Sequence, residues 1–166
     1  MSRAFVKEDD AGAPEEKVDL PVSAQPNRVT PAGLRMLRDK VKEYEDERAR
    51  LKGHEAELAA QSHLPRVEQE LRYWEARLRT AIPVDPAKQP RDKVAFGAVV
   101  TVEDDDGKRH DYQIVGEDEA APKDGKVSYV SPLARALDGA EVGDTIVWKR
   151  PAGDQELEVM AIKYEG

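Results

Sequence analysis

Residues 129–139, YVSPLARALDG, join the end of an apolar run to the signals of a short helix. Ser131 is a favourable N-cap, because its hydroxyl oxygen accepts a hydrogen bond from a free N–H group of the first turn. Pro132 suits the first helical position, where no backbone N–H is needed. Gly139 suits the residue that ends a helix in a left-handed conformation. The segment therefore predicts a short, sharply bounded helix that directly follows a strand.

Strand patterns lie on both sides of this helix. Residues 94–104, VAFGAVVTVED, are apolar and β-branched, and the DDDGKR segment after them contains an Asp-Gly turn. Further strand-like segments are HDYQIVGED and KVSYV before the helix, and GDTIVWKR and ELEVMAIKY after it. Residues 94–166 are therefore predicted to form an antiparallel sheet of five or six strands, with the one short helix over a face.

Residues 30–81 follow a helical period instead. Thr30 and Pro31 supply the cap and the first position of a helix. Apolar residues then recur in two registers, Leu34, Leu37, Val41, Tyr44, Leu51 and Leu58, followed by Leu64, Val67, Leu71, Trp74, Leu78 and Ala81. This spacing predicts two helices that share one narrow seam, with Trp74 packed across it. We place the reversal at AAQSHLP, residues 59–65, because Pro65 disfavours a helical residue before it.

These patterns divide the chain into four parts and predict an α+β fold. Residues 1–28 are polar, acidic and rich in Pro and Ala, which predicts a disordered arm, with a short strand as an alternative for SRAFV at its start. Residues 29–82 are expected to form an N-terminal antiparallel coiled-coil hairpin. A proline-rich linker, 83–93, follows, with an extended strand at AIPVD. Residues 94–166 form the sheet domain.

Composition excludes several classes of protein. The chain has 166 residues, 36% of them charged, and a net charge of −8, which disfavours general electrostatic binding of nucleic acid. It contains no cysteine, so it has neither disulfides nor thiolate chemistry. The N-terminus lacks the apolar region of a signal peptide, and no apolar run approaches the ~18 residues of a membrane-spanning helix. We therefore expect a cytoplasmic protein without a membrane partner.

Three segments resemble the bacterial Gre transcript-cleavage factors. They are VTPAGLRMLRDKV, VAFGAVVTVEDDDGKRHDYQIVGEDEA and VSPLARALDGAEVGDTIVWKRPAGDQELEVMAIKY, and the resemblance covers residues 29–166. It implies an FKBP-like C-terminal domain that docks on bacterial RNA polymerase at the rim of the secondary channel, and a coiled coil that enters the channel. The polymerase-binding residues that it implies are Val130, Ser131, Pro132, Leu133 and Arg135.

The predicted hairpin tip departs from this family. The resemblance implies two carboxylates in a Gly-Asp-x-x-Glu-Asn-Ala-Glu type of motif, which help hold the second Mg²⁺ of the polymerase. The matching stretch is GHEAELAA, in which Glu57 matches the Glu, His54 replaces the first carboxylate, and Glu55 lies one residue off the motif. Imidazole is a poor Mg²⁺ ligand. We therefore assign neither metal nor catalytic residues, expect no cofactor, and do not expect an enzyme.

The length of the hairpin leads to the same expectation. The segment from Val29 to Asp85 has 57 residues, about fourteen fewer than expected of the cleavage factors, which is one heptad from each arm. Seven residues shorten an arm by roughly 10 Å, whereas a Mg²⁺ ligand must lie within about 2.1 Å of the ion. The sequence therefore predicts a monomeric polymerase-binding regulator of elongation that does not stimulate RNA cleavage efficiently.

The sequence is compatible with several alternatives. The basic residues Arg48, Arg50, Lys52 and Arg66 could follow the 3′ end of nascent RNA, and ordinary outer positions of a coiled coil explain them equally well. A regulator of the nucleoside diphosphate kinase type is a second function, although the hairpin segment is long for it. An FKBP-like prolyl isomerase is a remote third, because it rests on fold analogy alone.

Overall fold

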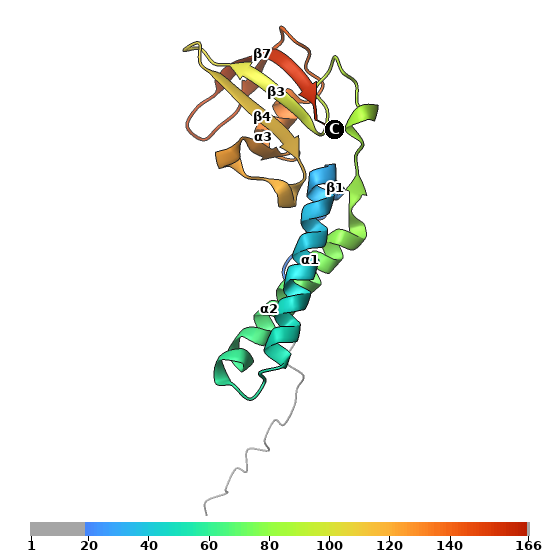
Figure 1. Cartoon of the computed structure of the whole chain (residues 1–166). Helices are drawn as coiled ribbons and strands as arrows, with labels where there is room; N and C mark the ends of the chain where they lie inside the picture. Colours follow the sequence, from blue (N-terminus) through green and yellow to red (C-terminus); the bar gives the residue numbers. More distant parts are fainter. Residues whose placement is uncertain (1–18, 166) are drawn as a thin grey trace, which may run out of the picture.

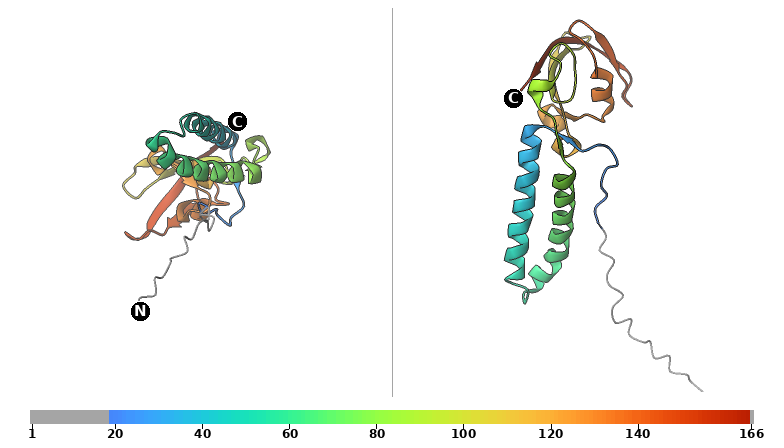
Figure 2. Two further views of the ribbon diagram at one scale, coloured as in Figure 1. Left: turned by 90° about the horizontal axis from the view of Figure 1, so that it is seen from below. Right: turned by 90° about the vertical axis from the view of Figure 1, so that its right-hand side faces the viewer.

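The computed structural model describes residues 19–165 and contains two parts, a helical hairpin and a curled sheet domain (Figure 1). Helices α1, Pro31–Lys52, and α2, Leu58–Thr80, run antiparallel and project away from the sheet, as Figure 1 and the right view of Figure 2 show. The α+β fold is as predicted. The SRAFV segment, for which a short strand was the alternative, lies outside the described residues.

The hairpin is closed by the predicted seam. The hydroxyl oxygen of Thr30 accepts from the N–H of Gly33 at 3.0 Å, so the predicted cap is present. The buried apolar residues of the two helices are Leu37, Leu51, Ala60, Val67 and Leu71. One seam prediction was wrong, because Leu58 is 81% exposed at the start of α2. Trp74 is half-buried and contacts the first arm, with the Lys40 ammonium of α1 5.8 Å from its ring centre.

The reversal between the helices differs from the prediction. It occupies residues 53–57, whereas Pro65 lies inside α2. A proline within a helix removes one backbone hydrogen bond and costs about 3 kcal/mol. Ala60 and Val67, on either side of Pro65, are buried in one cluster with Leu51, and this burial offsets the loss. The helix therefore continues through the proline, and the turn forms at Gly53.

The sheet domain contains five strands in the order β5-β4-β3-β7-β6. The bounds are Ala98–Glu103 for β3, Arg109–Val115 for β4, Lys126–Ser128 for β5, Thr145–Trp148 for β6 and Gln155–Tyr164 for β7. Three of the four pairings are antiparallel, as predicted, but β4 and β5 are parallel. The sheet is mixed because two 3₁₀ turns, η2, Glu117–Glu119, and η3, Pro122–Asp124, form a crossover in place of a hairpin.

Helix α3, Pro132–Leu137, covers one face of this sheet. Ser131 accepts from the N–H of Ala134 at 3.2 Å, and Gly139 has φ 77°, so both ends of the helix are as predicted. Its buried residues pack into one core with alternate residues of β3, and the two sets are Leu133, Ala134 and Leu137, and Ala98, Val100 and Val102. The position of the loop before α3 is thus set by the core.

The segment before the hairpin is ordered over residues 19–28, so the predicted disordered arm is wrong there. Strand β1, Arg28–Val29, pairs in parallel with β2, Ile82–Pro83, which confirms the extended strand predicted at AIPVD. Asn27 is buried. Strand pairing and buried polar contacts compensate for the conformational entropy that this segment loses on ordering, a cost that its composition alone suggested would not be met. A 3₁₀ turn, η1, Pro86–Lys88, then leads into the sheet.

Candidate functional site

The hairpin tip brings the three predicted tip residues together. His54 Nδ1 lies 3.3 Å from Glu57 Oε1, and the N–H of Glu57 donates to the carbonyl oxygen of His54 at 2.9 Å. The carbonyl oxygen of Glu55 accepts from the side-chain amide of Gln61 at 3.0 Å. All three tip side chains are exposed. The turn is therefore internally bonded, with one of its two carboxylates beside an imidazole.

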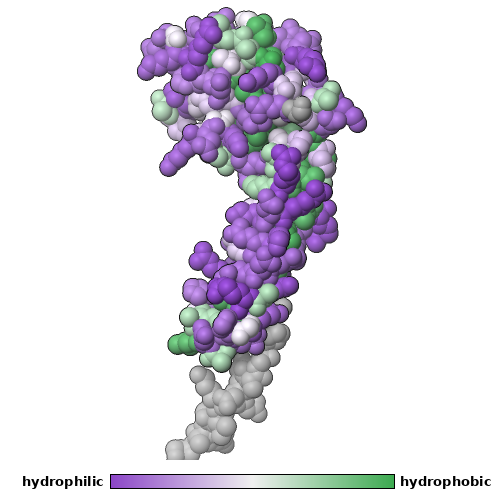
Figure 3. Space-filling model, viewed as in Figure 1, coloured by the Kyte–Doolittle hydropathy of each residue, from purple (hydrophilic) through white to green (hydrophobic). Residues whose placement is uncertain are grey.

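An apolar side chain adjoins these carboxylates. Leu58, the first residue of α2, is among the exposed large hydrophobic residues, and Figure 3 shows a small hydrophobic spot toward the far end of the hairpin, with weakly hydrophobic and polar residues beside it. Within residues 19–165, no group of three or more His, Cys, Asp or Glu side chains could hold a metal ion. The tip by itself therefore offers two carboxylates and one leucine to a partner.

The loop before α3 presents only part of the predicted binding set. Pro132 and Arg135 are exposed, and Val130 and Ser131 are half-buried. Leu133 is 3% exposed and belongs to the core, so its predicted role as a surface contact is wrong. The reason is the helical period, since Leu133 and Leu137 are four residues apart and share the inner face of α3. Arg135 projects from the outer face.

The tip lies at the far end of the hairpin, whereas this loop belongs to the sheet domain at the other end of the hairpin (Figure 1). Helix α1 has 22 residues, which at 1.5 Å per residue extend about 33 Å from the sheet domain. One surface can thus be held at a fixed site while the other reaches a distant one. The distance between them depends on how the hairpin joins the sheet.

A buried arginine that the sequence analysis missed forms that junction. Arg77 of α2 is 1% exposed. Its Nε donates to Asp118 Oδ2 at 2.5 Å, and its Nη2 donates to Asn27 Oδ1 at 2.8 Å. Asn27 in turn donates to the carbonyl oxygen of Arg77 at 2.7 Å. One side chain therefore connects the hairpin, the η2 turn of the sheet domain and the segment before α1.

Two more groups surround this arginine. The Tyr73 hydroxyl donates to the other oxygen of Asp118, and burial, followed by the hydrogen bond to Asp118, raises the pKa of Tyr73 to about 12. Glu117 Oε2 is 3.7 Å from Arg77 Nη2 and has no hydrogen-bond partner among the described residues. Arg77 therefore compensates two carboxylates at once, which makes the junction dependent on its charge.

A third carboxylate of η2 holds the start of α1. Glu119 Oε2 accepts from the backbone N–H groups of Thr30 and Gly116, at 3.1 and 3.0 Å, and the Thr30 hydroxyl donates to the other oxygen. A negative group is favourable at a helix N-terminus. The acidic triplet of η2 and an arginine three residues after Trp74 were the available sequence signals. Neither signal alone indicates that these residues meet.

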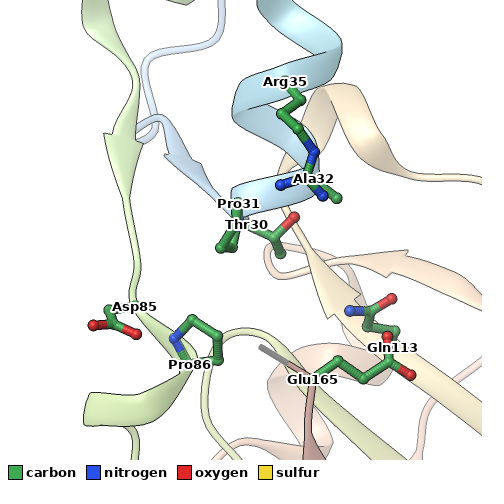
Figure 4. A pocket seen from close by; sticks show the side chains of 8 residues that line it. All are labelled: Thr30, Pro31, Ala32, Arg35, Asp85, Pro86, Gln113 and Glu165. Atoms are coloured by element: carbon green, nitrogen blue, oxygen red, sulfur yellow. The ribbon is translucent and has the colours of Figure 1, made fainter.

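A cleft of about 460 Å³ separates the start of α1 from the sheet domain. Figure 4 shows its lining, which comprises Thr30, Pro31, Ala32 and Arg35 from the hairpin side, Asp85 and Pro86 from the linker, and Gln113 and Glu165 from the sheet domain. The lining contains one guanidinium and two carboxylates but no histidine, serine or cysteine. The cleft is thus an interdomain groove of mixed polarity.

Comparison with known proteins identifies relatives of the whole arrangement. A model of the C-terminal region of the transcription elongation factors GreA and GreB matches residues 89–164. The chain is 33% identical over 153 residues to transcription elongation factor GreB of Neisseria meningitidis serogroup B, covering 83% of this chain and 94% of that protein. It is 37% identical over 152 residues to GreA of Ralstonia nicotianae, covering 82% and 96%. These relatives confirm the resemblance indicated by the sequence motifs.

Other matches are more limited. GreA of Thioalkalivibrio sulfidiphilus is 45% identical over 100 residues, and that match spans 59% of this chain and 63% of the relative. Among solved structures, GreA factor homolog 1 of Thermus thermophilus is 25% identical, covers 84% of this chain and 99% of its own, and has a TM-score of 0.41. The family assignment rests on the sequence relatives. Within residues 19–165, no helix combines the length and the apolar character that crossing a membrane requires.

Proposed function

Because the chain belongs to the GreA/GreB family of transcription elongation factors, we propose that it binds RNA polymerase and regulates transcription elongation. The sheet domain docks on the rim of the secondary channel through the loop before α3, and the hairpin enters the channel. The protein acts through this contact and is not itself an enzyme. The protein regulates elongation without stimulating transcript cleavage efficiently.

The observation behind this proposal is the placement of two surfaces at opposite ends of the hairpin. Pro132 and Arg135 are exposed beside α3, and the tip at residues 53–57 is at the opposite end of the hairpin. The buried contacts of Arg77 fix the hairpin relative to the sheet. A docked sheet domain would therefore hold the tip at a defined depth.

The tip supports a regulator in preference to a cleavage factor. His54 occupies the position of one expected carboxylate, and its ring nitrogen lies 3.3 Å from Glu57, the remaining matched one. A Mg²⁺ ion requires oxygen ligands at close to 2.1 Å in octahedral geometry. The helices contain 22 and 23 residues, and a missing heptad in each arm corresponds to roughly 10 Å of reach. Chemistry and distance thus both disfavour metal binding in the channel.

Site-directed probing tests the docking geometry. The chain contains no cysteine, so Glu55→Cys creates a single attachment point at the tip for an iron chelate that generates hydroxyl radicals. In a complex with core RNA polymerase, we expect cuts in the segments that line the secondary channel. Lys163→Cys, on an exposed residue of β7, is the matched control and should give a different set of cuts. Identical patterns from both positions, or no cuts above background, would contradict insertion of the hairpin.

A further inference from the structure

A small pocket lies beside the loop before α3. It has a volume of about 150 Å³ and is lined by Arg28, Phe96, Ile114, Tyr129, Ala134, Arg135 and Asp138. These residues come from three separate parts of the chain, since Arg28 precedes the hairpin, Phe96 and Ile114 belong to the sheet domain core, and Arg135 is on α3. The pocket adjoins the surface proposed to dock on polymerase.

Two guanidinium groups line this pocket. Arg28 and Arg135 are both exposed, and neither forms an ion pair with any residue in the range 19–165. One carboxylate, Asp138, is also in the lining, so the pocket has an excess of positive charge on a chain whose net charge is −8. A guanidinium presents several N–H donors in a planar fork that matches a carboxylate. The unpaired arginines therefore favour an acidic group from outside the chain.

The pocket is preorganised by Tyr129. Its hydroxyl donates to the carbonyl oxygen of Pro26, and its ring packs edge-on against Phe96 with the centroids 5.6 Å apart. The guanidinium carbon of Arg28 lies 5.7 Å from the Tyr129 ring centre. This contact holds the arginine beside the pocket without neutralising its charge. The segment before the hairpin is thus attached to the sheet domain and adds a positive group to its surface.

The volume of the pocket indicates whether it binds a small molecule or a single side chain of a larger partner. Pockets for small molecules typically have volumes of about 300–1,000 Å³, whereas this pocket is about half the lower bound. It has room for a single side chain with an aliphatic stem. Phe96, Ile114 and Ala134 give the lining an apolar part that suits such a stem. The geometry therefore favours a protein partner over RNA.

We propose that this pocket receives an Asp or Glu side chain of RNA polymerase, paired with Arg28 and Arg135. The inference rests on the proposed function, because it names the chemistry by which that docking surface recognises its partner. It also assigns a role to the segment before the hairpin, which lies outside residues 89–164 matched by the family model. Docking thus depends on a surface composed of both parts of the chain.

Binding of the full chain to core RNA polymerase tests this pairing. Arg28→Gln and Arg135→Gln should each weaken binding at least about tenfold at low salt, since truncating one partner of a close charge pair is costly. The double variant should bind with a smaller dependence on salt concentration, because two charge contacts are lost. Lys163→Gln makes the same change of charge at an exposed residue of β7 and should change the affinity less than about twofold.

The outcomes separate the two proposals. If the unaltered chain does not bind polymerase, the proposed function fails, and this pairing fails with it. If the chain binds and the double variant binds equally well, the pairing alone is overturned. A single-stranded RNA probe tests whether the pocket binds phosphate instead. If the double variant loses RNA binding but still binds polymerase, the pocket is a phosphate site and the pairing is overturned. Thermal unfolding within about 2 °C of the parent is required of each variant, since both arginines are exposed.

Discussion

Arg77 of α2 and Asp118 of η2 form a buried ion pair between the hairpin and the sheet domain. Arg77 Nε and Asp118 Oδ2 are 2.5 Å apart, and the exposed fractions of the two side chains are 2% and 7%. The pair is largely separated from water. Arg77 Nη2 also donates to Asn27 Oδ1, and Glu117 Oε2 lies 3.7 Å from the same nitrogen. We infer that the pair serves mainly to specify one orientation of the hairpin, because the cost of desolvation opposes the attraction between the two charges.

Replacement of Arg77 by Met should destabilise the chain by about 3–5 kcal/mol, because Asp118 and Glu117 are then left without their cation. Urea unfolding followed by circular dichroism gives the free energy of unfolding. Arg79→Met is the matched control on the same helix, and its exposed side chain predicts a change within about 0.5 kcal/mol. Equal stability of the two variants would contradict a structural role for the pair. Adding Asp118→Leu to Arg77→Met should recover part of the loss.

Gly33→Ala should destabilise the chain, although alanine is ordinarily the better helix former by about 1 kcal/mol. A Cβ at this position would overlap the Glu119 carboxylate, which accepts hydrogen bonds from Thr30 and Gly116. Displacing the Glu119 carboxylate breaks these hydrogen bonds and should cost about 1–3 kcal/mol. Thermal and urea unfolding measure the difference.

Two controls isolate that cause. Gly53 has φ −67°, and a Cβ there would lie 3.4 Å from the nearest atom, the Arg50 carbonyl oxygen, so Gly53→Ala should stabilise the chain by about 0.4–1 kcal/mol. In a Glu119→Ala background, Gly33→Ala should become stabilising as well. A stabilising effect of Gly33→Ala in the parent chain would show that Glu119 moves aside without cost.

The environment of Tyr73 predicts that the folded chain loses stability at alkaline pH. Its pKa is raised from 10.0 to about 12 by burial and by the hydrogen bond to Asp118, so the folded state favours the neutral phenol. This contribution is complete below pH 10 and declines as the pH rises toward 12. Urea unfolding across this range should show a steeper decline for the parent chain than for Tyr73→Phe, which has no phenol to ionise. Parallel curves would contradict the assigned environment of Tyr73.

The loop before α3 should contribute to polymerase affinity. Ser131→Glu combined with Pro132→Ala alters both the cap and the exposed ring, and the expected loss of binding free energy is about 1–3 kcal/mol. A binding titration with core RNA polymerase measures it. Pro122→Ala, at the exposed first position of η3, is the control that should bind as the parent chain does. Unchanged affinity in a folded double variant would remove this loop from the interface.

The chain should not accelerate RNA cleavage in a stalled, backtracked elongation complex with labelled RNA and Mg²⁺. His54→Asp alone should leave this result unchanged, because the reach is still short by roughly 10 Å. Lengthening each arm by one heptad together with His54→Asp should produce cleavage. Faster release of short 3′ fragments by the parent chain would refute the prediction, and loss of that activity in Glu57→Ala would assign it to the tip.

Local signals were sufficient for much of the fold. Ser131, Pro132 and Gly139 determine the ends of α3 because caps and turns depend on neighbours within a few residues. The two helical stripes and the alternating segments likewise predict elements by their period. The family resemblance follows from the same stretches. The tip residues His54, Glu55 and Glu57 are close in sequence and lie together in the turn between the two helices.

Contacts between distant residues decided the rest. The position of the reversal depends on packing of Ala60 and Val67 with Leu51, which outweighs the local preference of Pro65. The junction depends on Arg77 meeting Asp118 and Asn27, which are 41 and 50 residues away in sequence. A charged residue beside an apolar stripe has the same sequence pattern whether water or a carboxylate surrounds it. Only tertiary folding removes the water, and burial then requires the charge to be paired.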